Sequence, residues 1–436
     1  NQSGHLEGLK NIQSPLRLSL FPYVSAYYAP ESNKEFKISG GLDLKYGIND
    51  AFTLDLTLIP DFGQVSFDEQ VNNLGPFEVF FEERRPFFTE GLELFSRAEL
   101  FYSRRIAGDN NYFNKYGVPE GKSIQDYPTK NKLLNAFKLT GRDKDGLGVG
   151  VFNAIEGRSY ATLKDNETGE TEKLLINSVS NFNMIVLDKN LKNNSYISFI
   201  NTNVIRQGEF RDANVSGIDF DIRNKKQNYF VKGNGSFSYI SEKEIAKPGY
   251  KYVIDVGKNS GNFTYDLLYQ EISKRYDPTD MGFLGIFNNR STILNIAYST
   301  YVQSKYRNKS TSSFSVQYDR QLKPDVFANF ALETGHFYLD RNFNAAQVTI
   351  RAEPVITYDY YEPRRSDFSR YYTYPTNIMV RSFISSDYRK PFALDASYNY
   401  RQWNEDGRLQ HNMDLSPRIR FNDHFSIFGT VGFNKL

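Results

Sequence analysis

The sequence predicts an all-β protein, a large antiparallel transmembrane β-barrel of roughly 18–20 or more strands with one long loop folded as a plug or constriction. Three observations predict it. Apolar and polar residues alternate with a period of two, the alternating segments are long, and the stretch Asp61–Asn131 separates two of them without continuing the pattern. No repeat, low-complexity run or Pro/Ser-rich linker divides the chain, so residues 1–436 are expected to form a single barrel domain.

The alternation gives each expected strand an apolar face and a polar face. On both sides of the turn at Asn49-Asp50, and again further along the chain, apolar and charged residues occupy alternate positions. The apolar set is Leu42, Leu44, Leu54, Leu56, Phe263 and Leu267, and the charged set is Asp43, Lys45, Asp55 and Asp266. We expect the apolar set to face lipid and the charged set to face the barrel interior.

Segment length favours a membrane barrel over other β folds. Segments such as Leu16–Ala29, Ser291–Gln303 and Val326–Asp340 run for about 10–15 residues, whereas strands of globular proteins average about 5–6. An outer-membrane strand needs about 9–11 residues to cross. Soluble sandwiches, propellers and β-helices show the same alternation and remain the alternative. No run of the sequence approaches the ~18 apolar residues of a transmembrane helix.

The connections predict an orientation. About 19 strands can be counted, and if the first runs outward from the periplasm, the even-numbered turns are mostly short while several odd-numbered connections are long. Asp61–Asn131, Gly157–Glu170 and Tyr361–Tyr372 are long, whereas Lys323–Asp325 is short although it falls on the same side. Short periplasmic turns with long external loops are typical of outer-membrane barrels. An odd number of strands leaves an open edge, so we expect either one further strand outside this sequence or a count that is off by one.

Composition excludes several function classes. The 53 Lys and Arg residues nearly balance the 51 Asp and Glu residues, which gives no support for a nucleic-acid partner. The absence of cysteine excludes disulfides, thiolate metal sites and a cysteine nucleophile. The four His residues are scattered and no catalytic motif is present, so we expect no enzyme activity, no cofactor and no metal.

The stretch Asp61–Asn131 combines carboxylates and guanidinium groups with many Phe residues. Buried Phe would anchor the stretch against the barrel wall, and Arg–carboxylate pairs would keep it rigid. The candidate plug or constriction residues are Asp61, Asp68, Glu69, Glu78, Glu82, Glu83, Arg84, Arg85, Glu90, Arg104 and Arg105. A solvated loop is the simpler alternative, and a catalytic carboxylate pair or a calcium site is weaker still.

A second candidate lies in the external loop Tyr360–Tyr372. Its aromatic and basic side chains suit stacking on a sugar or an anionic glycan, and a loop that contacts lipopolysaccharide would have the same composition. The candidate ligand-binding residues are Arg364, Arg365, Tyr371 and Tyr372.

Four motifs carry a family resemblance. Gly8–Tyr28, Pro60–Gly91, Phe101–Ile106 and Asp280–Gly285 are similar to the C-terminal outer-membrane barrel of a Bacteroidota domain-of-unknown-function family, which is often found behind a carbohydrate-binding family 9-like module. The resemblance implies an outer-membrane location and supplies no established activity.

These observations favour a channel or transporter-like pore for a polar solute, an oligosaccharide or a peptide, in the outer membrane of a Gram-negative bacterium. The alternative is an accessory or scaffold barrel with a closed lumen in a larger envelope complex. The expected partners are outer-membrane lipid, lipopolysaccharide and other envelope proteins. No nucleic-acid partner is expected.

Overall fold

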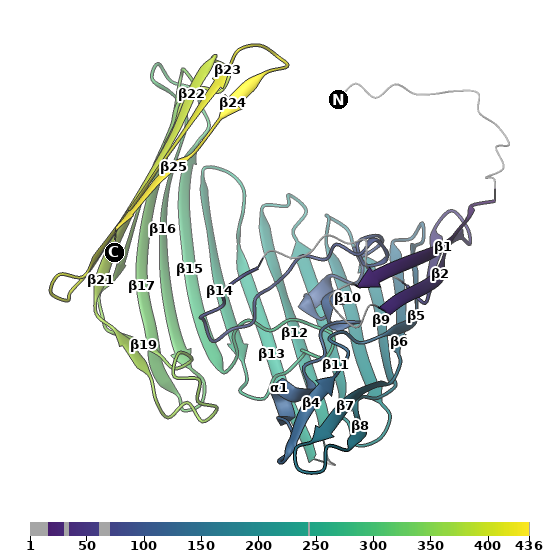
Figure 1. Cartoon of the computed structure of the whole chain (residues 1–436). Coiled ribbons are helices and arrows are strands. Elements are labelled where there is room, and N and C mark those ends of the chain that lie inside the picture. Colours follow the sequence, from purple (N-terminus) through teal and green to yellow (C-terminus); the bar gives the residue numbers. More distant parts are fainter. Residues whose placement is uncertain (1–15, 30–34, 61–69, 243–244, 436) are drawn as a thin grey trace, which may run out of the picture.

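One antiparallel sheet of twenty strands dominates the structure, a computed structural model that describes residues 16–29, 35–60, 70–242 and 245–435 (Figure 1). The strands before its midpoint are β1 (Leu18–Ala29), β2 (Glu35–Gly47), β3 (Phe52–Leu58), β5 (Leu133–Arg142), β6 (Leu147–Glu156), β9 (Ser180–Asn190), β10 (Tyr196–Arg206), β11 (Asp212–Arg223), β12 (Tyr229–Glu242) and β13 (Ile245–Lys258). The strands after it are β14 (Phe263–Ile272), β15 (Asn289–Thr300), β16 (Arg307–Gln321), β17 (Val326–Asp340), β18 (Ala345–Glu353), β21 (Asn377–Ser385), β22 (Phe392–Trp403), β23 (Leu409–Arg420), β24 (Ser426–Phe428) and β25 (Val431–Lys435).

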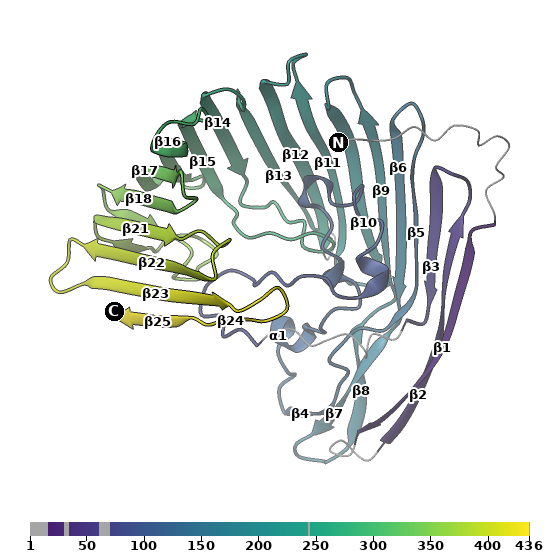
Figure 2. The same ribbon diagram turned by 90° about the horizontal axis from the view of Figure 1, so that it is seen from above.

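From β1 to β23, each strand of this sheet pairs with the next strand of the sheet along the chain, so the sheet is a meander. Because β24 and β25 both pair with β23, the twenty strands occupy nineteen positions, which agrees with the sequence count. Seen from above, the sheet is an open arc with β1 and β25 at its two ends (Figure 2). Among the described residues no pairing joins these two edges.

The segment between β3 and β5 lies inside the arc (Figure 2). Its described part, residues 70–131, is called the inserted segment below. It contains three single-turn 3-10 helices, η1 (Pro86–Phe88), η2 (Arg97–Glu99) and η3 (Ser103–Arg105), a short helix α1 (Tyr112–Tyr116) and one strand, β4 (Lys122–Asp126).

Two further small sheets lie at the ends of the wall strands. Strand β4 pairs with β7 (Ser159–Asp165), which pairs with β8 (Thr171–Asn177). Strands β19 (Thr357–Asp359) and β20 (Tyr372–Tyr374) form a hairpin between β18 and β21. Half of the expected loop Gly157–Glu170 is therefore strand β7. A period of two does not show whether a strand pairs within the large sheet or outside it.

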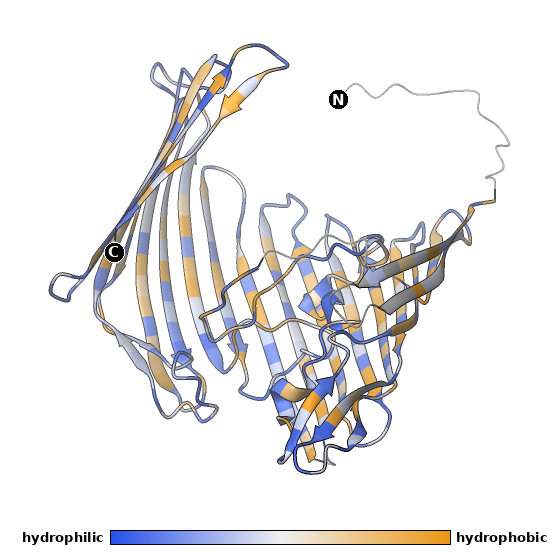
Figure 3. Cartoon of the chain, viewed as in Figure 1, coloured by the Kyte–Doolittle hydropathy of each residue, from blue (hydrophilic) through white to orange (hydrophobic). Residues whose placement is uncertain are grey.

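The apolar set and the charged set of alternating residues lie on opposite faces of the arc, as expected. Leu44 pairs with Leu56 on the convex face, while Lys45 and Asp55 lie on the concave face, where they contact Glu90 and Lys138. The alternation is visible along the wall strands when they are coloured by hydropathy (Figure 3). The predicted fold class is confirmed, because the chain is nearly all β and consists of one large antiparallel sheet around a long insertion.

The hydrophobic core lies between the inserted segment and the concave face of the first half of the sheet. No helix in the described ranges is long and apolar enough to cross a membrane. The short connection at Lys323–Asp325 is a true hairpin between β16 and β17. The neighbouring loop folds against it, since the hydroxyl of Tyr360 donates a hydrogen bond to the carbonyl of Phe327.

Candidate functional site

Phe side chains fix the inserted segment to the wall. Phe88 and Phe95 are fully buried, and both rings pack against Phe152 of β6, with centroids 6.3 and 6.1 Å apart. Further core residues of the wall are Phe182, Met184, Val186, Ile200, Val204, Ala213 and Val215. In the middle of β6 and β9 to β11 the concave face is therefore apolar and covered by the inserted segment. The expected burial of Phe holds for Phe88 and Phe95, whereas Phe80 is 56% exposed.

A buried ion pair holds two turns of the inserted segment together. The side chains of Glu83 and Arg85 are 10% and 8% exposed, and Arg85 Nη2 lies 2.7 Å from Glu83 Oε2. Arg85 also donates to the carbonyls of Ser103 and Ile106, at 2.8 and 2.7 Å. Burial raises the pKa of Glu83, but the hydrogen bonds and charge of Arg85 and the hydroxyl of Ser103 outweigh it and lower this pKa to about 2. The pair is therefore ionised at neutral pH.

Charged side chains of the wall bind the backbone of the inserted segment. Lys138 of β5 is 1% exposed and donates to the carbonyls of Phe87 and Glu90, both at 2.6 Å. Glu156 of β6 accepts a hydrogen bond of 2.7 Å from the amide of Ala107. The inserted segment is thus held at the wall through its main chain as well as its side chains.

Further ion pairs join the inserted segment to β9 and β13. Asp188 is fully buried and pairs with Arg97 at 3.5 Å and with Arg142. Lys251 pairs with Glu99 at 2.6 Å. Sequence reasoning missed these wall residues. Their signal is a charged residue on the apolar parity of a strand, as in Phe182, Met184, Val186 and Asp188.

The predicted plug residues pair mainly with one another. Arg105 meets Glu78 at 2.6 Å, and Arg104 Nε donates to the carbonyl of Glu82 at 3.1 Å. The amide of Arg84 donates to Glu83 at 3.0 Å, and Glu90 pairs with Lys45 of β2 at 2.6 Å, which lowers the pKa of Glu90. Asp61, Asp68 and Glu69 lie outside the described residues.

Of the four predicted external-loop residues, Arg364 contacts the inserted segment, and the other three contact residues near them in the sequence. Arg364 donates to the carbonyl of Leu74 in the inserted segment at 2.6 Å. Arg365 pairs with exposed Asp367 at 3.3 Å, the ring of Tyr371 packs on Tyr358, and that of Tyr372 packs on Tyr374. The loop and the inserted segment, predicted as two separate sites, therefore touch.

The second half of the concave face is polar. Three arginines and two glutamates form a ladder across β17, β18, β21 and β22: Glu333, Arg351, Glu353, Arg381 and Arg401. Arg381 meets Glu333 at 2.8 Å and Arg401 meets Glu353 at 3.1 Å. Alternate residues of β18 on the convex face are apolar, with Val348 45% exposed. Among the described residues, none of β15 to β23 belongs to the core beneath the inserted segment.

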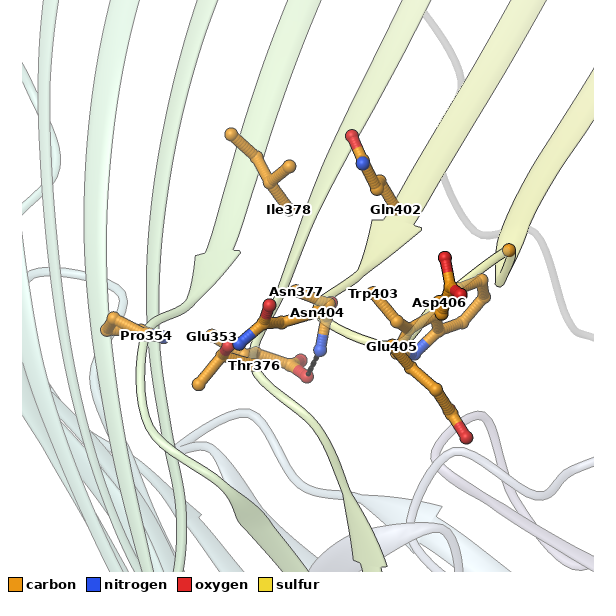
Figure 4. A pocket seen from close by; sticks show the side chains of 11 residues that line it. Glu353, Pro354, Thr376, Asn377, Ile378, Gln402, Trp403, Asn404, Glu405 and Asp406 are labelled. Carbon is orange, nitrogen blue, oxygen red and sulfur yellow. Dashed lines mark hydrogen bonds between the residues drawn. The ribbon is translucent and has the colours of Figure 1, made fainter.

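A polar hollow of about 610 Å³ lies at one end of this ladder (Figure 4). Glu353, Asn377 and Trp403 lie in one cross-strand row, and the loop after β22 adds Glu405 and Asp406. The Trp403 ring is flanked by the guanidinium groups of Arg401 and Arg408, 4.9 and 4.6 Å from its centroid. An aromatic ring beside carboxylates and amides can bind a solute that carries hydroxyl groups.

The fold and the two halves of its concave face define a class of protein. Its members have a large antiparallel β-sheet with an insertion fixed against one half of the concave face and charged residues on the other half. The chain belongs to the family described as domain of unknown function DUF5916, whose model matches residues 14–436. One solved structure that it resembles is OccAB2 of Acinetobacter baumannii, with a TM-score of 0.38 and 8% identity, over 70% of this chain and 87% of that one. No curated protein matches the sequence.

Proposed function

We propose that this chain is a channel-like barrel in the outer membrane of a Gram-negative bacterium, which carries a polar solute past the arginine–glutamate ladder. The observation that carries the proposal is the division of the concave face. One half carries the hydrophobic core and is covered by the inserted segment, which binds the buried charges Lys138, Glu156 and Asp188 of that half. The other half presents Arg351, Arg381 and Arg401 with their glutamates. The inserted segment would narrow the lumen from one side and leave the charged side for the solute.

The convex face supports a membrane location. Apolar side chains such as Phe199, Ile218 and Phe237 are 45–52% exposed on this face. Large exposed apolar surfaces are unfavourable in water and are typical of a surface that contacts lipid or another protein. Lipid and lipopolysaccharide are the partners proposed for this face. A Bacteroidota origin and an association with a carbohydrate-binding family 9-like module stay predictions.

An oligosaccharide or a peptide fits the polar half. The ladder supplies three positive and two negative charges, so it offers donors and acceptors with a small positive excess. Trp403 in the hollow at its end could stack on a sugar ring or an aromatic side chain. We propose no catalytic role for any of these residues.

Planar-bilayer recording tests the proposal. The purified chain should give discrete ion conductance with a preference for anions, and Arg381→Glu with Arg401→Glu should shift that preference toward cations. Val348→Thr on the convex face is the matched control and should leave selectivity unchanged. A folded, membrane-inserted protein that never conducts would reject the channel.

The second candidate is a scaffold barrel with a closed lumen. It is favoured by the fixed position of the inserted segment, which Lys138, Glu156 and Asp188 hold from three different wall strands. Absence of conductance together with stable co-purification of other envelope proteins would select it.

A further inference from the structure

Four asparagines interrupt an apolar row on the convex face. Residues that pair across successive strands form this row, which runs through Leu20, Leu44, Leu56, Phe137, Asn153, Asn183, Asn203, Asn214 and Tyr239. The residues on either side of each Asn along its strand, such as Phe182 and Met184 beside Asn183, are buried beneath the inserted segment. The four amides therefore point away from the concave face.

Three further polar residues widen the row into a patch. Asn181, Asn201 and Ser216 lie on the same face of the same strands, and with the four row residues they make up the amide patch. Its convex neighbours are apolar, with Ile185, Phe199 and Ile205 exposed by 48, 45 and 52%. The amide patch carries no charged residue.

The amides of the patch bond to one another but leave hydrogen-bonding capacity unused. Asn153 Nδ2 donates to Asn181 and Asn183, at 2.6 and 2.8 Å. Asn201 Nδ2 donates to Ser216 Oγ at 2.8 Å. Within the described part of the chain, Asn203 makes no side-chain hydrogen bond, and every primary amide has two donor hydrogens and two acceptor lone pairs. Lipid chains offer no partner for these groups.

We propose that the amide patch is the contact surface for a second copy of this chain within the membrane, an inference that rests on the proposed outer-membrane location. A row of amides is self-complementary, because each group both donates and accepts. A two-fold interface requires such a surface, since the same patch meets itself. An axis between β9 and β10 would bring Asn203 of one copy close to Asn183 of the other. The phosphates of lipopolysaccharide would instead require cationic side chains, which the amide patch lacks.

Cysteine cross-linking in native membranes tests this interface, because the chain has no cysteine of its own. Asn203→Cys and Asn183→Cys, each alone, should give a cross-linked species of about twice 50.4 kDa with a short bis-maleimide. Val348→Cys, which is also convex but lies on β18, is the control and should stay monomeric. The double variant Asn183→Leu with Asn203→Leu should fold and show at least a tenfold weaker dimer by native mass spectrometry.

The outcomes separate the two proposals. Membrane-inserted, folded cysteine variants that react with a lipid-soluble maleimide but form no dimer would overturn the interface and leave the channel standing. Cross-linking to a different protein would also overturn the second copy as partner. A chain that does not fractionate with the outer membrane would overturn the location on which both proposals depend.

Discussion

Glu83 and Arg85 form an ion pair of 2.7 Å within the inserted segment, with both side chains about nine-tenths buried. Since the same guanidinium group reaches the carbonyls of Ser103 and Ile106, one side chain joins the turn that carries the buried Phe88 to the turn Ser103–Arg105. The buried pair thus fixes two turns of the inserted segment relative to one another.

Replacing Arg85 by Ala should leave the Glu83 carboxylate buried without its partner. Breaking a buried pair in this way costs about 3–5 kcal/mol. We expect the inserted segment of Arg85→Ala to become a protease target under conditions where the wild-type segment resists. Arg365→Ala removes a pair whose side chains are both 52% exposed and should cost about 0–1 kcal/mol. Equal protease resistance of wild type and Arg85→Ala would contradict this role.

The low pKa of Glu83 predicts a loss of stability in acid. Its folded pKa of about 2 lies below the unfolded value of about 4.3. The stabilisation is therefore complete above pH 4.3 and is lost as the pH falls toward 2. Thermal unfolding midpoints of wild type and Glu83→Gln should differ at pH 6 and converge near pH 2. A difference that stays constant over this range would show that ionisation of Glu83 does not stabilise the fold.

Phe152 couples the wall to the inserted segment, because its ring lies under Phe88, Phe95 and Phe101. Phe152→Ala should cost about 3–5 kcal/mol through the cavity it leaves. Phe199→Ala on the convex face, where Phe199 is 45% exposed, should have a smaller effect. Chemical unfolding in detergent micelles measures both, and equal effects would mean that the two faces are equally packed.

The strands could be predicted because a period of two is a local signal. Val326–Asp340 was expected as one segment and is strand β17 with those bounds. The sequence did not predict that strands β4, β7 and β8 form a separate sheet. The alternation within β7 is the same whichever strand it pairs with. Pairing of the two edges of the arc likewise cannot be read from the alternation. The prediction that a further strand exists or that the count is off by one stays a prediction.

The candidate site could be predicted in kind but not in its partners. The density of Glu, Arg and Phe in Asp61–Asn131 predicted a rigid, anchored segment. Its contacts with Lys138, Asp188 and Lys251 depend on strands that are distant in sequence, and the order of strands around the arc decides which of them meet. The ladder of Arg351, Arg381 and Arg401 was missed for the same reason. These three residues lie on three different strands, and each strand alone shows only an isolated charged residue.

The most direct test of a membrane wall with a water-filled concave side uses two neighbouring strands. Ile350 of β18 is convex and 38% exposed, while Arg381 of β21 is concave with a side chain 46% exposed. In outer membranes, a charged maleimide should label Arg381→Cys and spare Ile350→Cys, and a lipid-soluble maleimide should label Ile350→Cys. Rapid labelling of Ile350→Cys by the charged reagent would contradict the membrane wall, and with it the proposed channel.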